Sequence, residues 1–405
     1  MHLFKNEKID NIRMVTLLGL PVYSTKVTIK SRTQRVLGGL IYTIKLNCKT
    51  KERKMVKILN KTVSERVLEN DTMRYYLFGR LIKTFHLMQK IYDKYFKNLN
   101  IQYDDVYILS SNSGEIFLFL AYLAKAVFKK NNSKAPLFVA TKKYHIDILK
   151  MYLPTVPHIF IEGMQLKIQG DAFEFRGHKF FMIFSGSHFE RVELAVKNQE
   201  IGTTHYLKSI IDTLCVSEDD CYRPNPVISL DVNKSLSNKI SEIDLRLNNF
   251  VIVAPEALSC SELPMGFWEQ IVSELKKQGY DVFLNITEQK NYINGCKTTL
   301  LTFSELYSLS QKSRGVISLR SGLSEFILPA NIPNVSIYTR FRNKTSDRAF
   351  SVDKGIAGFS MFKIPFVNHS MIVELNADGY VSLDELKEIT MKSFEKLQSL
   401  RESLV

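Results

Sequence analysis

Two blocks of the sequence alternate short apolar runs with segments of helical periodicity, and this pattern constrains the fold more than any other feature. The strand-like runs of the first block are 105–110, 136–141, 158–163 and 177–184. Those of the second block are 250–257, 280–286, 315–322 and 334–340. Strands that alternate with helices form right-handed βαβ units around a parallel sheet. We therefore predict an α/β protein with two doubly wound, Rossmann-like domains that face a cleft, where such sheets bind their ligands.

A polar stretch separates the two blocks. Residues 216–249 are rich in Ser, Asn and Asp and contain Pro224 and Pro226, which is typical of a linker. The chain ends in an amphipathic helical pattern at 382–402, which we expect to cross back onto the first domain. The predicted organisation is a small basic N-terminal module at 1–100, Rossmann-like domains at 101–220 and 250–380, a linker at 221–249 and a C-terminal helix at 381–405.

Positive charge is concentrated in the N-terminal module. Residues 1–100 hold 21 Lys and Arg against 7 Asp and Glu, so they account for the whole net charge of +14. A β-hairpin-like pattern covers 12–47, and a helical pattern rich in aromatic and basic residues covers 56–98. Such a block suits an anionic partner, either phospholipid or nucleic acid. The alternatives are a solvated basic face and a helix whose aromatic residues pack on the first domain.

Composition excludes several other classes of protein. The chain has 405 residues, of which 45% are hydrophobic, and this suffices for two globular domains. Its five cysteines form no CxxC pair, which argues against a zinc or redox motif and fits a reducing cytosol. No run reaches the roughly 18 apolar residues of a membrane span, and no signal-peptide pattern is present. We therefore expect a cytoplasmic protein.

Three segments resemble the heptosyltransferase-type, family nine glycosyltransferases. The first, VYILSSNSGEIFLFLAYLAKA at 106–126, has the strand, turn and apolar helix that open that family's first domain. The second, at 251–285, resembles the strand, loop and Trp-containing helix that open the donor domain. The third, at 300–340, resembles the helix, strand, Asp-Ser-Gly turn, helix and strand that follow, and 204–216 resembles a His-containing helix. The resemblance implies the GT-B fold, in which the first domain binds the acceptor and the second the nucleotide-sugar donor.

The sequence departs from that family at positions that bear on the substrate. Glu115 after Gly114 stands in place of the family's Asp, and Arg320 replaces the Asp of Asp-Ser-Gly. Glu325 falls near the place of a family His, and the family's donor-phosphate Lys has no clear counterpart in APEALSCSELP. The nucleotide and the sugar of the family are therefore not carried over to this chain.

The turn after the first strand of the first domain holds the best candidate for a catalytic base. Sugar transfer requires a base that takes the proton of the acceptor hydroxyl. Glu115 follows this turn, where the cleft is expected, and His188 after a later strand is the fallback. The alternative for Glu115 is an acid stabilised by the helix dipole. We interpret His145 and His205 as structural residues. The acceptor-binding candidates are Ser111, Asn112, Ser113 and Gly114.

The second domain carries the candidates for donor binding. Ser321 and Gly322 lie between a strand and a helix, where backbone N–H groups bind phosphate, and Arg320 beside them matches a diphosphate. The alternative is an ordinary turn in which Arg320 pairs with Glu325. The other donor-binding candidates are Pro255, Glu256, Ser259, Glu325, Arg340 and Arg342. Cations and helix N-termini would stabilise the leaving diphosphate, so we expect no metal and no cofactor.

These residues together predict a glycosyltransferase that moves a sugar from a nucleotide-activated donor to a glycan or lipid-linked glycan in bacterial surface polysaccharide biosynthesis, such as capsule or lipooligosaccharide. The basic module suits a peripheral protein at the anionic inner face of the cytoplasmic membrane. The alternatives are a nucleotide-sugar epimerase of the same fold and a non-catalytic polysaccharide-assembly protein. We do not expect nucleic-acid binding, because residues 1–100 contain no known nucleic-acid-binding module.

Overall fold

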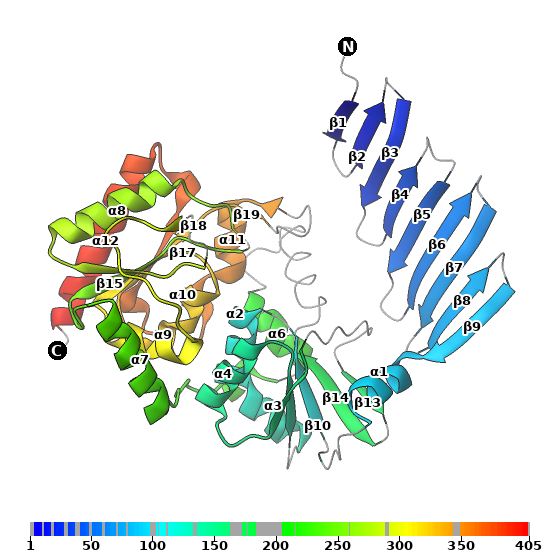
Figure 1. Ribbon diagram of the computed structural model, residues 1–405, viewed down its shortest axis with the longest axis horizontal. Helices are drawn as coiled ribbons and strands as arrows, with labels where there is room; N and C mark the ends of the chain where they lie inside the picture. The colour runs from blue at the N-terminus through cyan, green and yellow to red at the C-terminus, as the bar shows by residue number, and fades with distance from the viewer. Residues whose placement is uncertain are drawn as a thin grey trace. The chain divides into compact units, whose positions relative to one another are not determined.

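The computed structural model describes most of the chain between residues 4 and 403 (Figure 1). The residues outside the description are 1–3, 10–11, 18–19, 28–30, 37–40, 48–50, 59–60, 70–71, 78–79, 98–102, 104, 111, 133–135, 163–171, 176, 184–204, 215, 259, 288–290, 343–348 and 404–405. The chain forms two compact units, Met1–Gln102 with Met164–Gly177 and Tyr103–Gly163 with His178–Val405. Within the described residues, no helix combines the length and the hydropathy that a bilayer span requires.

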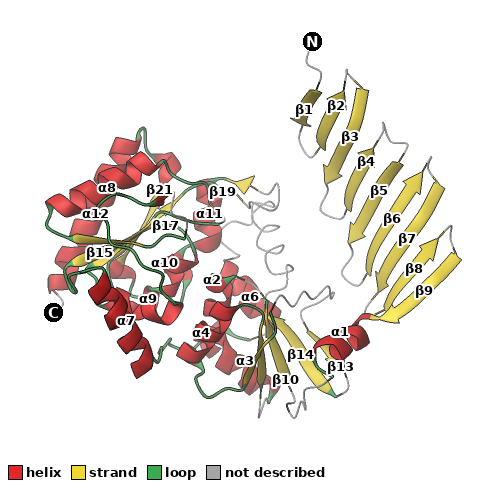
Figure 2. Ribbon diagram, viewed as in Figure 1, coloured by secondary structure: helices red, strands yellow, loops and turns green. Residues whose placement is uncertain are grey.

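The first unit is built on a nine-stranded antiparallel sheet in which each strand pairs with its neighbours in sequence (Figure 2). Its strands are β1 (Phe4–Ile9), β2 (Ile12–Leu17), β3 (Leu20–Val27), β4 (Ser31–Val36), β5 (Ile41–Asn47), β6 (Lys51–Ile58), β7 (Lys61–Glu69), β8 (Thr72–Leu77) and β9 (Arg80–His86). Helix α1 (Leu87–Tyr95) follows, and the unit also contains strand β13 (Ala172–Phe175). The rings of Tyr92 on α1 and Phe175 on β13 lie 5.5 Å apart.

The prediction of one helix over 56–98 is wrong for most of that range. Among the described residues of that range, only Leu87–Tyr95 is helical, and those before it belong to strands β6 to β9. The signals against a helix are the pairs Asn70-Asp71 and Phe78-Gly79, since short connections rich in Asn, Asp and Gly join the strands of hairpins. The hairpin-like pattern at 12–47 is likewise part of the larger sheet, as strands β2 to β5.

The second unit begins with parallel strands in the order β12-β11-β10-β14. These strands are β10 (Asp105–Leu109), β11 (Leu137–Ala140), β12 (His158–Phe160) and β14 (His178–Ile183). The helices around them are α2 (Ser113–Leu118), which continues through a π-helical turn (Phe119–Leu123) into α3 (Ala124–Asn131), then α4 (Lys143–Tyr152) and α6 (Tyr206–Leu214). Every residue of β10 is buried, as expected for a central strand of a parallel sheet.

A second parallel sheet follows, with strand order β16-β15-β17-β18-β21. Its strands are β15 (Phe250–Ala254), β16 (Asp281–Leu284), β17 (Gly315–Leu319), β18 (Asn334–Tyr338) and β21 (Ile372–Asn376). Its helices are α8 (Met265–Lys277), α9 (Phe303–Gln311), α10 (Gly322–Phe326), α11 (Val352–Phe359) and α12 (Leu383–Ser403), and β19 (Phe341–Arg342) pairs with β20 (Ala349–Phe350). The two sheets confirm the predicted α/β class with two Rossmann-like domains.

Two segments between and after the domains differ from the sequence pattern. The predicted linker contains a helix, α7 (Leu230–Glu242), whose N-cap residue Ser229 accepts a hydrogen bond from the Val232 N–H at 3.3 Å. The C-terminal helix α12 does not cross back onto the first domain. It packs on α8, where Phe394 joins the core around Trp268, because its apolar face completes the second domain's core.

Helices α2 and α10, which start at the carboxyl ends of β10 and β17, join the two Rossmann-like domains. The Phe117 ring of α2 lies edge-on to the Phe326 ring of α10, with 5.5 Å between the centroids. A second contact lies at the start of α9, where Asp147 of α4 accepts hydrogen bonds from the Ser304 N–H at 2.9 Å and from Ser304 Oγ at 2.6 Å. Apolar and polar contacts therefore hold the two domains together.

The start of β17 has no room for a side chain. A Cβ on Gly315 would lie 2.6 Å from Pro333 O and 2.8 Å from the Phe394 ring. We predict that Gly315→Ala lowers the free energy of unfolding by about 1–3 kcal/mol, the usual cost of overpacking. Gly266→Ala on α8 is the control, because nothing lies within 4 Å of its Cβ position. Urea unfolding of both variants measures the difference, and equal midpoints would contradict the prediction.

Candidate active site

Two turns, one from each Rossmann-like domain, meet at the carboxyl ends of the central strands. Strand β10 leads into α2 through the N-cap residue Asn112, and β17 leads into α10 through the N-cap residue Ser321. The helices touch at Gly114 and Gly322: a Cβ on Gly322 would lie 3.1 Å from the Gly114 nitrogen. A larger residue at either position would push the two backbones apart. This approach brings the predicted catalytic and donor-binding turns together.

Glu115 lies in the first turn of α2 and is half-buried. Its carboxyl is hydrogen-bonded to the side chains of Tyr206, at the start of α6, and Asn112. Burial raises the pKa of Glu115 above its usual value, the negative charge of Glu325 raises it further, and the two hydrogen bonds partly oppose the shift. A carboxyl with a raised pKa is suited to accept and then release a proton near neutral pH.

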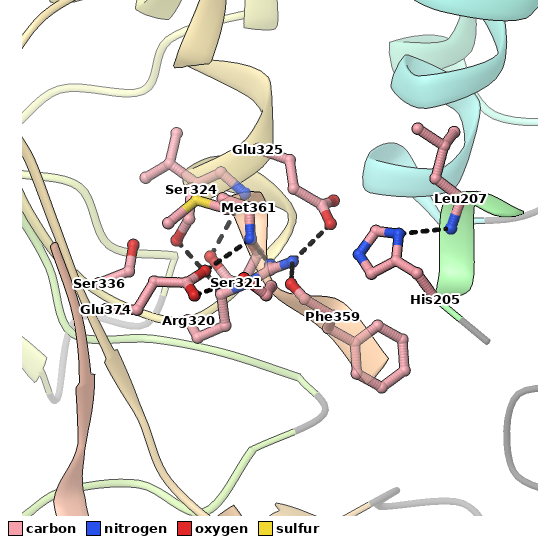
Figure 3. A network of polar contacts seen from close by, with 12 residues as sticks. His205, Leu207, Arg320, Ser321, Ser324, Glu325, Ser336, Phe359, Met361 and Glu374 are labelled. Atoms are coloured by element: carbon pink, nitrogen blue, oxygen red, sulfur yellow. Dashed lines mark hydrogen bonds and ion pairs between the residues drawn. The ribbon is translucent and has the colours of Figure 1, made fainter. Parts of the chain in front are cut away.

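Arg320 is buried at the end of β17 and forms an ion pair with Glu325 of α10 (Figure 3). Its Nη2 donates to Glu325 Oε1 at 2.5 Å and to Phe359 O at 3.0 Å. Its Nε donates to Tyr338 Oη at 3.0 Å, and its Nη1 to Ser321 O at 2.6 Å. Burial alone would lower the pKa of the guanidinium, but the charge of Glu325 and these hydrogen bonds raise it. The pairing of Arg320 with Glu325 is thus observed, and a diphosphate role for Arg320 stays a prediction.

The polar network continues on the other side of Arg320. Tyr338 Oη lies 2.6 Å from Glu374 Oε1 on β21, and the same carboxylate oxygen accepts the Met361 N–H at 2.6 Å. Burial raises the pKa of Tyr338 well above its usual value, and Glu374 adds to the shift, so the phenol stays neutral and can donate. The guanidinium of Arg320 therefore lies between two carboxylates, one in direct contact and one reached through Tyr338.

His205 immediately precedes α6 and lies close to this network (Figure 3). Its Nδ1 accepts the Leu207 N–H at 3.2 Å, which satisfies one donor at the start of the helix. Burial lowers the pKa of His205 to about 3, and the charges of Lys363 and Arg320 act in the same direction. The imidazole is therefore neutral at physiological pH.

The other predicted residues of the second domain follow strands of the same sheet and bond to nearby loops. Glu256, after β15, accepts hydrogen bonds from the Thr287 N–H at 2.8 Å and from Thr287 Oγ1 at 2.6 Å. Its neighbour Pro255 is buried. Arg340, after β18, is exposed and pairs with Asp378 at 3.3 Å. The donor-binding role of these residues stays a prediction.

Several predicted residues lie outside the described residues. They are Ser111, His188 and Ser259, together with the side chain of Arg342. In the first domain, Asn112 is exposed, and Ser113 Oγ lies 3.4 Å from the position that a Cβ on Gly322 would take. The described acceptor-binding candidates thus lie at the start of α2, next to α10, and their role stays a prediction.

Three residues belong to this network although the sequence pattern did not single them out. Tyr206 and Tyr338 lie in apolar helical and strand patterns, where a tyrosine looks like an ordinary core residue. Glu374 does carry a signal, because it interrupts the apolar start of IVELN in β21. A charge in a partly buried strand is stabilised by a partner, and here the partners are donors from other elements.

Two further features bear on possible binding sites, namely groups of metal-binding residues and hollows in the surface. Within the described part of the chain, no three His, Cys, Asp or Glu residues are grouped as a metal ion would require. A hollow of about 260 Å³ is lined by Arg246, Lys276, Asp281 and Lys297, among others. Asp281 begins β16, so this hollow lies at the amino end of that strand, at the opposite edge of the sheet from Arg320.

Comparison with known proteins gives similarities of fold. No protein-family model and no curated protein matches the sequence. Among solved structures, the chain is similar to a family 9 glycosyl transferase from Veillonella parvula, with 11% identity, a TM-score of 0.47 and coverage of 73% of this chain and 97% of that chain. It is also similar to the E. coli ADP-heptose LPS heptosyltransferase II, with 10% identity, a TM-score of 0.45 and coverage of 74% and 99%. The E. coli glycosyltransferase TibC has 13% identity, a TM-score of 0.41 and coverage of 90% and 94%. The first of these bears the name of the family that the sequence resembles.

The buried pair of Arg320 and Glu325 gives a prediction for stability. Replacing one partner leaves the other charge buried and unpaired, so Arg320→Met should lower the free energy of unfolding by about 3–5 kcal/mol. The double variant Arg320→Met/Glu325→Leu should recover most of that loss, because both charges are then gone. The exposed pair of Arg340 and Asp378 is the control, and Arg340→Met should change stability by less than about 1 kcal/mol. Urea unfolding that gives equal losses for the single and double variants would contradict this.

The lowered pKa of His205 predicts a pH dependence of stability. Because the folded-state pKa of about 3 lies below the unfolded value near 6.5, the unfolded state binds the proton first as pH falls. The wild type should therefore lose about 2–3 kcal/mol of unfolding free energy between pH 7 and 4.5 relative to His205→Gln. His369→Gln, at an exposed position, is the control and should follow the wild type. Parallel curves for wild type and His205→Gln would show the prediction to be wrong.

Proposed function

We propose that this chain is a glycosyltransferase that uses a nucleotide-activated sugar. The observation that carries the proposal is the position of Glu115 at the start of α2. Its carboxyl has a raised pKa, is held by Tyr206, and lies at the carboxyl edge of one Rossmann-like sheet, where α2 contacts α10 of the other. A base can take the proton of the acceptor hydroxyl, and positive groups can stabilise the leaving diphosphate; the two turns would supply one of these functions each.

In the proposed reaction, Glu115 takes the proton of the acceptor hydroxyl. The hydroxyl oxygen then attacks the anomeric carbon of the donor, and the bond from that carbon to the diphosphate oxygen breaks, so the nucleotide diphosphate leaves with the electron pair. Tyr206 positions the carboxyl through its hydrogen bond. Asn112, Ser113 and Gly114 would bind the acceptor, with Ser111 in the same turn.

Donor binding is proposed for the loops that follow β15, β17 and β18. Arg320 would exchange its single bond with Glu325 for a bond with the diphosphate, which is favourable because phosphate oxygens can accept two parallel N–H bonds from a guanidinium. Arg340 is exposed and would add a second cation. In this proposal the leaving group is stabilised by cations and backbone N–H groups and requires no metal. The remaining donor-binding residues would be Pro255, Glu256, Ser259, Ser321, Gly322, Glu325 and Arg342.

The acceptor is proposed to be a glycan or lipid-linked glycan of a bacterial surface polysaccharide. A lipid-linked acceptor would be met at the inner face of the cytoplasmic membrane, which is anionic. The excess positive charge of residues 1–100 suits such a location and supports a peripheral association with that surface.

A panel of nucleotide sugars in a thermal-shift assay tests the proposal. A glycosyltransferase should be stabilised by one nucleotide sugar and by the matching nucleotide diphosphate, since both bind the folded state. The stabilising sugar nucleotide is then incubated with glycan and lipid-linked glycan acceptors, and product is followed by mass spectrometry. Conversion of the sugar nucleotide into an isomer without transfer would indicate an epimerase instead, and no stabilisation by any nucleotide sugar would indicate a non-catalytic protein.

The role of Glu115 gives a kinetic prediction. Glu115→Gln should lower kcat by about 10²–10⁴ while donor affinity stays the same, because the amide cannot accept the proton. Tyr206→Phe should move the acidic limb of the pH–rate profile to higher pH, since the lost hydrogen bond lowers the pKa of Glu115 in the wild type. Glu242→Gln, at an exposed position on α7, is the control and should leave both quantities unchanged. A kcat close to that of the wild type in Glu115→Gln would assign the base elsewhere.

A further inference from the structure

The register of the nine-stranded sheet gathers basic residues into one row across neighbouring strands. Arg32 of β4 pairs with Lys45 of β5, which pairs with Lys54 of β6, which pairs with Arg66 of β7. Arg66 pairs with Tyr75 of β8, and Tyr75 pairs with Lys83 of β9. Directly paired residues share one face of a sheet, and neighbouring strands are about 4.8 Å apart, so the row extends over about 24 Å. Of these side chains, that of Lys54 is described and is exposed.

The rows on either side, two positions along each strand, contain one charged residue each among the paired residues. One row contains Gln34, Thr43, Val56, Ser64, Leu77 and Arg80 across β4 to β9. The other contains Asn47, Glu52, Leu68, Met73 and Phe85 across β5 to β9. Five of the six basic residues in these three rows therefore lie in a single line across the sheet, and the sixth, Arg80, lies beside its end.

Like charges at directly paired positions destabilise a sheet. An anion bound along the row would therefore reduce the repulsion between its positive charges. We expect the shape of that anion to match the shape of the row. The total charge of residues 1–100 suits the membrane surface proposed above, whereas the row itself is linear. A bilayer presents its charge in two dimensions and would gain little from the rows beside it, which contain one charged residue each. A linear polymer with a negative charge in each repeat fits a line of cations that crosses six strands. Tyr75, within the row, is a residue type that offers an apolar ring for a sugar to pack against.

We propose that the row Arg32, Lys45, Lys54, Arg66, Tyr75 and Lys83, called the basic row here, binds an acidic glycan chain, so that the acceptor of this enzyme is a polyanionic polysaccharide. This inference rests on the proposed glycosyltransferase function and specifies its acceptor. The first unit then holds the acceptor polymer along its length by charge, and the Rossmann-like domains supply the chemistry.

Binding of full-length protein to a defined acidic glycan tests the proposal. The probe is a fluorescent oligogalacturonate, which has one carboxylate per sugar, and the neutral comparison is a maltooligosaccharide of equal length. The row variant Lys45→Gln/Lys54→Gln/Arg66→Gln is matched by Lys26→Gln/Arg53→Gln/Lys57→Gln. Both variants remove three positive charges from the sheet, but the second leaves the basic row intact. Circular dichroism and thermal melting confirm that each variant is folded, and the single variant Lys54→Gln replaces the triple variant if the triple variant does not fold.

The wild type should bind the acidic glycan with an affinity that falls as salt rises, and should not bind the neutral one. The row variant should lose roughly tenfold or more in affinity, as expected for lost charge-assisted contacts, and the matched variant should stay within about twofold of the wild type. Equal losses in the two variants would overturn the proposal, because net charge alone would then account for binding.

Two further measurements separate the competing partners and the underlying function. Stronger binding to phosphatidylglycerol vesicles or to a single-stranded oligonucleotide than to the acidic glycan would also overturn the proposal, in favour of a membrane surface or a nucleic acid. Nucleotide-sugar stabilisation is measured on the same preparations. Donor stabilisation without glycan binding would refute the acceptor assignment alone, whereas absence of both would refute the proposed function as well.

Discussion

The contact between the backbones of Gly114 and Gly322 is the constraint on which the rest of the site depends. It lets helices α2 and α10 start side by side, although they belong to different Rossmann-like domains. Glu115 follows one glycine, and Glu325 lies in the first turn of the other helix, so the charge of Glu325 acts on the half-buried carboxyl of Glu115. A side chain at either glycine would separate the helices and admit water between the charges, and the electrostatic coupling that tunes Glu115 would weaken.

Burial has two opposite consequences for the charged groups of this site. Burial raises the pKa of Glu115, which suits a proton acceptor. Burial also destabilises the charge of Arg320 unless groups of the protein hydrogen-bond to it. Arg320 satisfies that requirement with Glu325, Tyr338 and backbone carbonyls, and a buried pair of this kind is costly to break from one side only. Any donor that binds at Arg320 must therefore replace one strong interaction by another.

In the first unit, the pairing of strands determines how the basic residues are arranged. The excess of Lys and Arg in residues 1–100 is visible in the composition, but composition does not say whether the bases are scattered or aligned. Pairing of β4 to β9 places Arg32, Lys45, Lys54 and Arg66 in successive strands of one row. A shift of one residue in any strand would move that strand's base to the other face, because the side-chain period of a strand is two.

The sequence by itself determined the two βαβ blocks. A parallel strand that is buried on both faces, such as β10, requires a continuous run of apolar residues, and such a run is visible in the sequence. It also determined that Glu115 and Arg320 lie in turns at the carboxyl ends of strands. It did not determine that the described residues between 51 and 86 form strands β6 to β9, since the basic and aromatic residues there also match a helical pattern. Only the tertiary structure decided that Tyr206, Tyr338 and Glu374 belong to the site, because their burial and their hydrogen bonds come from elements distant in sequence.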